Sequence, residues 1–187
     1  MEQTFCTVCG GRTEMRIPPD DDHERAVCTA CGTVHYQNPK MVVGCIPVKG
    51  DQILMCKRDI EPGRGLWTLP AGYLENGESV QAGAARESFE ETGSRVGIVS
   101  PYRLYNITRV SQVYFMFIAD LLDDNFGPTS ESQEVKLVSE DEVPWDDIAF
   151  EVIRQTLKDF FTDRRRGQGF EFAVKDLEAK PIKSCCG

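Results

Sequence analysis

The segment from Gly72 to Ser94, GYLENGESVQAGAARESFEETGS, constrains the fold of this chain more than any other. Residues Ser79–Thr92 contain no proline and a single glycine, so they can form a helix. Side chains three and four positions apart share a helix face, so Glu87, Glu90 and Glu91 converge. Carboxylates on one stripe repel each other unless a cation neutralises them, and hard oxygen ligands suit Mg2+ or Mn2+. The spacing therefore predicts a helix that carries a divalent-metal site.

An ordinary solvated helix face is the alternative interpretation of any single glutamate in this segment. Glutamate is common on exposed helix faces, and Arg86 with Glu90 can form an ion pair four residues apart. The complete pattern is more specific than its parts. Gly72 is followed after five residues by Glu78, after seven more by Arg86-Glu87, and then by Glu90-Glu91 and Gly93.

This spacing matches the Nudix box, Gly-x5-Glu-x7-Arg-Glu-U-x-Glu-Glu-x-Gly-U with U aliphatic, at every polar and glycine position. Ser88 and Ser94 stand where the box has its two aliphatic residues. We expect these serines to weaken the packing beneath the helix and to leave the metal ligands intact. With this box, residues 40–165 resemble a Nudix hydrolase.

The resemblance implies an α/β fold, namely an α/β/α sandwich with a mixed sheet in which the box forms a loop, a helix and a second loop. It also implies hydrolysis of a nucleoside diphosphate linked to another group, at the P–O–P bridge. Divalent ions screen the negative oxygens in such a reaction, lower the pKa of a bound water and stabilise the leaving phosphate. By the resemblance, the ligands are the Gly72 carbonyl and the carboxylates of Glu87, Glu90 and Glu91, and Glu78 pairs with Arg86 to hold the site.

A fourth acid in this family often comes from a later loop, as a metal ligand or as the catalytic base. Glu134 is the first choice in this chain because it precedes a short expected strand, and Glu131 is the second. Both could instead be acids of a surface loop.

Three residues before the box are candidates for contacting the substrate. Arg58 and Arg64 could stabilise the charge of a diphosphate. Trp67 could stack on a base, and a place in the core is an equally good interpretation of this residue.

The first four cysteines form a second motif near the start of the chain. Two such Cys-x2-Cys turns, each followed by glycine, bring four thiolates into a tetrahedron around Zn2+. A site closed by four cysteines is structural rather than catalytic, and redox pairs are the alternative interpretation. Residues 1–36 resemble the zinc ribbon that some Nudix hydrolases carry, with His23 and His35 expected to be structural or solvent-facing. The four expected ligands are Cys6, Cys9, Cys28 and Cys31.

The charge and hydropathy of the chain restrict its expected partners. A balance of 21 Lys and Arg against 30 Asp and Glu gives a net charge of -9, which disfavours nucleic acid because such affinity comes largely from neutralised phosphates. A small phosphorylated substrate with a divalent metal remains compatible with this balance. No apolar run approaches the roughly 20 residues of a membrane helix, and no secretory signal is visible. We therefore expect a cytoplasmic protein with no nucleic-acid or membrane partner, whose eight cysteines are metal ligands or free thiols.

Apolar patterning predicts the elements around the box. The Nudix-like domain is expected to span residues 37–165, and residues 166–187 to form a C-terminal tail whose Cys185 and Cys186 have no role that the sequence indicates. The expected elements are strands at Met41–Val48, Ile53–Arg58, Arg95–Ile107, Gln112–Leu121 and Val135–Val138, and a helix at Ala149–Phe161.

The choice of substrate rests on resemblance alone. NADH pyrophosphatases with a zinc ribbon carry a Ser-Gln-Pro-Trp-Pro-Phe-Pro signature, whereas this chain has Ser111-Gln112-Val113-Tyr114-Phe115-Met116 and lacks the prolines. The runs Asn38-Pro39-Lys40 and Gly65–Gly72 are more similar to a group that includes the plant chloroplast enzyme for FAD and ADP-ribose. We expect FAD or ADP-ribose to be split to AMP plus FMN or ribose 5-phosphate. NADH or NAD pyrophosphatase activity is the alternative, and a non-catalytic nucleotide-sensing module is a second alternative. A homodimer is possible because members of the family are often dimers.

Overall fold

The computed structural model describes residues 3–178, which form two compact units divided between Asn38 and Pro39. The smaller unit contains the three-stranded antiparallel sheet β1-β2-β3. Its strands are β1 (Thr13–Arg16), β2 (Arg25–Cys28) and β3 (Val34–His35).

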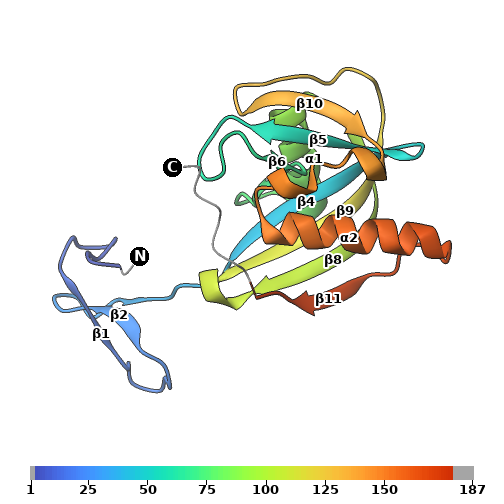
Figure 1. Ribbon diagram of the computed structural model, residues 1–187. Helices are drawn as coiled ribbons and strands as arrows, with labels where there is room; N and C mark the ends of the chain where they lie inside the picture. The colour runs from blue at the N-terminus through green and yellow to red at the C-terminus, as the bar shows by residue number, and fades with distance from the viewer. Residues whose placement is uncertain (1–2, 179–187) are drawn as a thin grey trace. The chain divides into compact units, whose positions relative to one another are not determined.

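The larger unit is built on one mixed sheet in the order β10-β5-β4-β9-β8-β11 (Figure 1). Strand β4 runs parallel to β9, and β11 runs parallel to β8, whereas the other neighbours along this path are antiparallel. Two short strands lie off the path, with β6 paired to β5 and β7 paired to β4. The strands are β4 (Lys40–Lys49), β5 (Gln52–Arg58), β6 (Trp67–Thr68), β7 (Ala71–Tyr73), β8 (Val96–Ile107), β9 (Gln112–Leu121), β10 (Ser132–Val138) and β11 (Ala173–Asp176).

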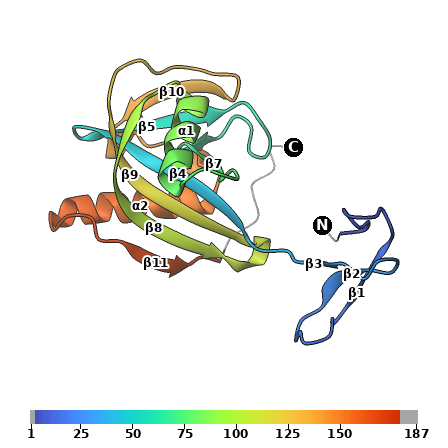
Figure 2. The same ribbon diagram turned by 180° about the vertical axis from the view of Figure 1, so that it is seen from behind.

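Helices α1 (Val80–Thr92) and α2 (Glu151–Arg166) cover opposite faces of this sheet, α2 in front in Figure 1 and α1 in front in Figure 2. Strand β9 shows why both faces need cover, because its apolar residues alternate between two cores. Phe117 packs in the core on the α1 face, and Met116 packs in the larger core with Leu157 and Phe160 of α2. The α/β/α sandwich with a mixed sheet is confirmed. Three 3-10 turns complete the unit, at Thr108–Val110, Glu140–Glu142 and Trp145–Asp147.

The box helix has the boundaries that its sequence predicts. The Ser79 hydroxyl caps the start of α1 by accepting a hydrogen bond from the Ala82 amide at 3.2 Å. Gly93 ends the helix in the left-handed conformation, with φ of 71°, and its N–H donates to the Phe89 carbonyl.

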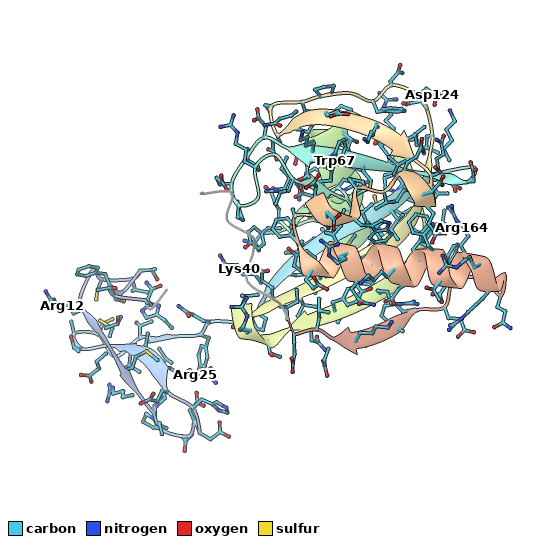
Figure 3. The ribbon with its side chains drawn as sticks, in the orientation of Figure 1. Arg12, Arg25, Lys40, Trp67, Asp124 and Arg164 are labelled. Carbon is cyan, nitrogen blue, oxygen red and sulfur yellow. The ribbon has the colours of Figure 1, made fainter. Side chains whose placement is uncertain are left out.

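The C-terminal part of the chain contains more structure than the sequence predicts. Helix α2 continues beyond Phe161 through the three arginines that end at Arg166, where positive charge favours the carboxyl end of a helix. The guanidinium of Arg164 lies over the ring of Phe160 at 4.5 Å (Figure 3). Strand β11 then adds to the sheet in a region that was expected to be tail. Cys185 and Cys186 lie outside the described residues.

Among residues 3–178, no helix combines the length and the apolar character that crossing a membrane requires.

Candidate active site

Helix α1 places its glutamates beside the main cavity of the larger unit. The cavity has a volume of about 760 Å3 and is lined by the box, the loop after β5, the start of β9 and the start of α2. Glu87 and Glu91 are only 7% and 4% exposed, and Glu90 lies at the exposed rim. All three line the cavity. Their carboxylate oxygens are not among the groups of acids in the described residues whose ligand atoms lie within 4.8 Å of one another, so the shared metal site stays a prediction.

Gly72 lets the backbone of β7 approach the carboxylate of Glu87. A Cβ atom added at position 72 would lie 2.2 Å from Glu87 Oε2, far inside van der Waals contact. Any side chain at this position would therefore displace the carboxylate. Carboxylates and backbone carbonyls are the oxygen donors that Mg2+ or Mn2+ takes, so the donor chemistry of these residues fits the divalent ion that the box implies.

Arg86 is the shared partner of three carboxylates. Its Nη2 lies 2.7 Å from Glu78 Oε1, and its Nη1 lies 2.8 Å from both Glu87 Oε1 and Glu90 Oε2. The hydrogen bond from Arg86 lowers the pKa of Glu78 to about 2. The Glu78–Arg86 pair that the resemblance implies is therefore formed, and it holds the arginine between the expected metal ligands.

Glu91 is the most deeply buried of the box acids. Its Oε2 accepts a hydrogen bond from the Ala71 amide at 2.9 Å, and its Oε1 lies 3.7 Å from Arg58 Nη1. Burial nevertheless raises the pKa of Glu91 to about 8, and burial also raises the pKa of Glu87. Glu91 thus needs a nearby cation in order to be fully ionised at neutral pH.

The three residues proposed to contact substrate have different positions. Arg58 lines the cavity, donates from Nε to the Pro62 carbonyl at 2.9 Å and lies over the Phe150 ring. Arg64 is exposed, pairs with Asp59 at 2.9 Å and is not part of the cavity lining. Trp67 packs in the core, outside the lining (Figure 3).

The two candidates for a fourth acid are also separated. Glu131 lines the cavity, and its negative charge adds to the burial that raises the pKa of Glu87 and Glu91. Glu134 lies exposed on β10, opposite Lys57 of β5 and outside the lining. A register shift between Ser132 and Glu134 separates the two acids, and such bulges redirect side chains next to active sites.

Several lining residues were not predicted as site residues. Gln112 and Tyr114 belong to the Ser-Gln segment that the sequence analysis used for substrate choice, and Gln112 Nε2 donates to the Tyr73 hydroxyl at 2.9 Å. The start of α2 contributes Phe150 and Arg154. Nothing in the local sequence of α2 indicates this position, because only the folded sandwich brings it to the box.

Ser88 and Ser94, which replace the aliphatic residues of the box, are fully buried. Their hydroxyls lie 3.1 Å apart, and the Thr92 hydroxyl lies 2.7 Å from that of Ser94. Hydrogen bonds among these three hydroxyls therefore replace the apolar packing of the box.

The smaller unit brings its four cysteines together as the spacing predicts. The sulfur atoms all lie within 4.8 Å of one another, and three pairs are 3.4, 3.5 and 3.7 Å apart. Four sulfurs at about 2.3 Å from a tetrahedral ion would be roughly 3.8 Å apart, so the cluster fits zinc. Neither His23 nor His35 belongs to the cysteine cluster, and His23 lies instead beside Asp21 and Asp22.

Family models match both units of the chain. Residues 4–37 match the model described as Nudix N-terminal, a zinc ribbon, and residues 38–160 match the NUDIX domain. The chain belongs to the Nudix hydrolase family.

Known Nudix proteins resemble the chain in sequence and structure. It is 30% identical over 167 residues to the NAD-capped RNA hydrolase NudC of Vibrio parahaemolyticus, covering 85% of this chain and 61% of that protein. The chain thus spans about three fifths of that curated relative. A crystal structure of a Nudix hydrolase from Nitrosomonas europaea is 48% identical, with a TM-score of 0.90 over 94% of this chain and 99% of that one. An ADP-ribose pyrophosphatase from Streptococcus suis shares the fold at 20% identity, with a TM-score of 0.60 over 75% of this chain and 100% of that one.

Proposed function

We propose that this protein is a divalent-metal-dependent hydrolase that cleaves the P–O–P bridge of a nucleoside diphosphate derivative and releases AMP. The observation that carries the proposal is the approach of Glu87 to the Gly72 backbone and of Glu91 to the Ala71 amide, beside a cavity of about 760 Å3. Cavities of this size accommodate a ligand as large as a nucleotide.

The proposed metal ligands are the Gly72 carbonyl and the carboxylates of Glu87, Glu90 and Glu91. A bound divalent ion would neutralise developing charge on the phosphate oxygens and make a bound water more acidic. The smaller unit is proposed to hold Zn2+ through its four cysteines, in a site closed to substrate.

The protein's own groups have separate tasks in this proposal. Arg86 bridges Glu87 and Glu90 and orients their carboxylates through its ion pairs, and Glu78 fixes Arg86. Arg58, held against Glu91 and Phe150, places positive charge at the wall of the cavity. Arg58 is therefore better placed to stabilise the charge of a bound diphosphate than the exposed Arg64, which lies outside the cavity lining.

Glu131 is proposed as the fourth acid in place of Glu134. It is the one of the two that lines the cavity with Glu87 and Glu91. A carboxylate there can accept a proton from an attacking water or complete the metal site.

ADP-ribose and FAD are the proposed substrates, and NADH and NAD+ are the alternatives. Tyr114 and Phe150 line the same cavity as the box acids, so aromatic rings are available to the end of the substrate that carries a base. The expected absence of a nucleic-acid partner stays a prediction, since relatives are named NAD-capped RNA hydrolases. NAD-capped RNA therefore belongs among the substrates to be tested.

The decisive experiment incubates the full chain with Mg2+ or Mn2+ and each of ADP-ribose, FAD, NADH, NAD+ and NAD-capped RNA, followed by identification of the products. Metal-dependent AMP release from ADP-ribose or FAD supports the proposal in full. Preference for a nicotinamide substrate or for capped RNA would overturn the substrate choice. Saturable binding with no product from any compound would favour the nucleotide-sensing module. Light scattering on the same sample tests the expected homodimer.

A further inference from the structure

The loop before β10 is attached to the last turn of α1. The final carbonyls of a helix have no partner within it, so other groups must supply hydrogen bonds. Here the Gly127 amide donates to the Thr92 carbonyl at 2.9 Å, and the Thr129 hydroxyl donates to the Glu91 carbonyl at 3.5 Å. Glu91, which supplies a buried box carboxylate, thus also binds this loop through its backbone carbonyl.

The Thr129 hydroxyl makes a second contact, directed at Glu131. Its oxygen accepts a hydrogen bond from the Glu131 amide at 3.1 Å, while the Thr129 amide donates to the Ser132 hydroxyl at 3.1 Å. The Glu131 carbonyl accepts in turn from the Asp59 amide at 2.8 Å. The N–H and the C=O of Glu131 are therefore both fixed, the N–H by Thr129 and the C=O by the loop after β5.

This anchoring coincides with the change of register at the start of β10. Ser132 lies opposite Arg58, and the shift before Glu134 breaks the regular alternation of side chains along the strand. Glu131 precedes the shift and faces the cavity, while Glu134 follows it and is exposed. The turn that Thr129 closes is thus the element that presents Glu131 to the box acids.

We propose that Thr129 is a positioning residue for catalysis, whose hydroxyl links the backbone of Glu91 to that of Glu131. The proposal rests on the proposed function, because it gives Glu131 the role of fourth acid. Thr129 itself is not part of the cavity lining. Its effect is to keep the carboxylate of Glu131 at a fixed distance from those of Glu87 and Glu91.

The test compares Thr129→Val, which keeps the shape and removes the hydroxyl, with Thr129→Ser, which keeps the hydroxyl. We expect Thr129→Val to lower kcat about tenfold with little change in KM, and Thr129→Ser to stay within threefold of the wild type. In a Glu131→Gln background, adding Thr129→Val should lower kcat less than twofold, since the positioned carboxylate is already absent. Losses that multiply in the double variant, or a Thr129→Val enzyme within twofold of the wild type, would overturn the proposal.

A measurement without metal or substrate gives an independent check. Hydrogen exchange of the Glu131 amide should accelerate at least about tenfold in Thr129→Val and remain slow in Thr129→Ser, while core amides of β4 and β9 keep their wild-type rates. Unchanged exchange at Glu131 in the valine variant would contradict the proposed link. If the wild type hydrolyses no diphosphate, the proposed function fails. If the wild type is active and is slowed by Glu131→Gln but not by Thr129→Val, only the role of Thr129 fails.

Discussion

The two predicted metal sites of this chain are assembled in different ways. The four cysteines of the smaller unit come from two short turns, and their spacing brings the sulfurs within 4.8 Å of one another. The acids of the larger unit lie on α1 and before β10, and their surroundings come from β5, β7 and α2. The first site is closed by its ligands, whereas the second opens onto a cavity that can admit substrate.

This difference shows what each site requires of the rest of the protein. Thiolate ligands and local turns form a site that stabilises its own small unit. Buried carboxylates are costly without a cation, so Glu87 and Glu91 depend on Arg86, Arg58 and the Ala71 amide to hold them in place. We therefore expect changes in the carboxylate site to act on turnover and changes in the cysteine site to act on local stability.

The largest effect is expected from Glu91→Gln. This change removes a proposed metal ligand and replaces a buried acid by a neutral group of the same shape, so kcat should fall by roughly a thousandfold or more while the fold is kept. Steady-state kinetics with Mg2+ measure the fall in kcat, and circular dichroism checks that the fold is kept. A kcat near that of the wild type would remove Glu91 from the metal site.

A smaller loss should distinguish Glu131 from Glu134. Glu131→Gln should lower kcat about 10- to 100-fold, because it removes a cavity acid, and Glu134→Gln serves as the matched control with less than a twofold change. Both variants are assayed with the best substrate of the wild type. The reverse order of losses would restore Glu134 as the fourth acid.

A third prediction concerns pH and stability in the absence of divalent metal. The pKa of Glu91 is raised from its usual value near 4.5 to about 8, so between these values the folded protein binds more protons than the unfolded chain. The free energy of unfolding should therefore decrease as pH rises from about 5 to 8, and Mn2+ should offset the decrease. Thermal melts across this range should show a shallower slope for Glu91→Gln. Equal slopes for the two proteins would mean that Glu91 is not the buried titrating group.

The smallest effect on turnover should follow removal of the metal from the smaller unit. Removal of Zn2+ by chelation followed by resupply of Mg2+, or Cys6→Ser with Cys31→Ser, should unfold the region around the cysteines and leave kcat within about threefold. Hydrogen exchange reports on residues 3–38 and an activity assay on the larger unit. Complete loss of turnover in a still-folded larger unit would show that the ribbon is more than structural.

The sequence allowed the box helix and the five long strands of the larger unit to be predicted, because their signals are local. The placement of Glu131 was harder, since a register shift decides which acid faces the cavity. Trp67 and Arg64 could be assigned only once the core and the partner Asp59 were located. Strand β11 is short and half exposed, and its parallel pairing with β8 joins segments about 70 residues apart, which periodicity alone does not reveal.

The buried hydroxyls of Ser88, Thr92 and Ser94 have a consequence for the evolution of the box. Replacing Ser94 by an aliphatic residue would remove the hydroxyl that lies within hydrogen-bond distance of both Ser88 and Thr92, at a cost of about 1–3 kcal/mol, whereas replacing Ser88 would leave Ser94 its partner Thr92 at 2.7 Å. The cost of a change at one position thus depends on the residue at the other. A lineage that exchanged the serines for the usual aliphatic pair would lose less stability by changing Ser88 first, so we expect homologues with a single serine to retain the one at position 94.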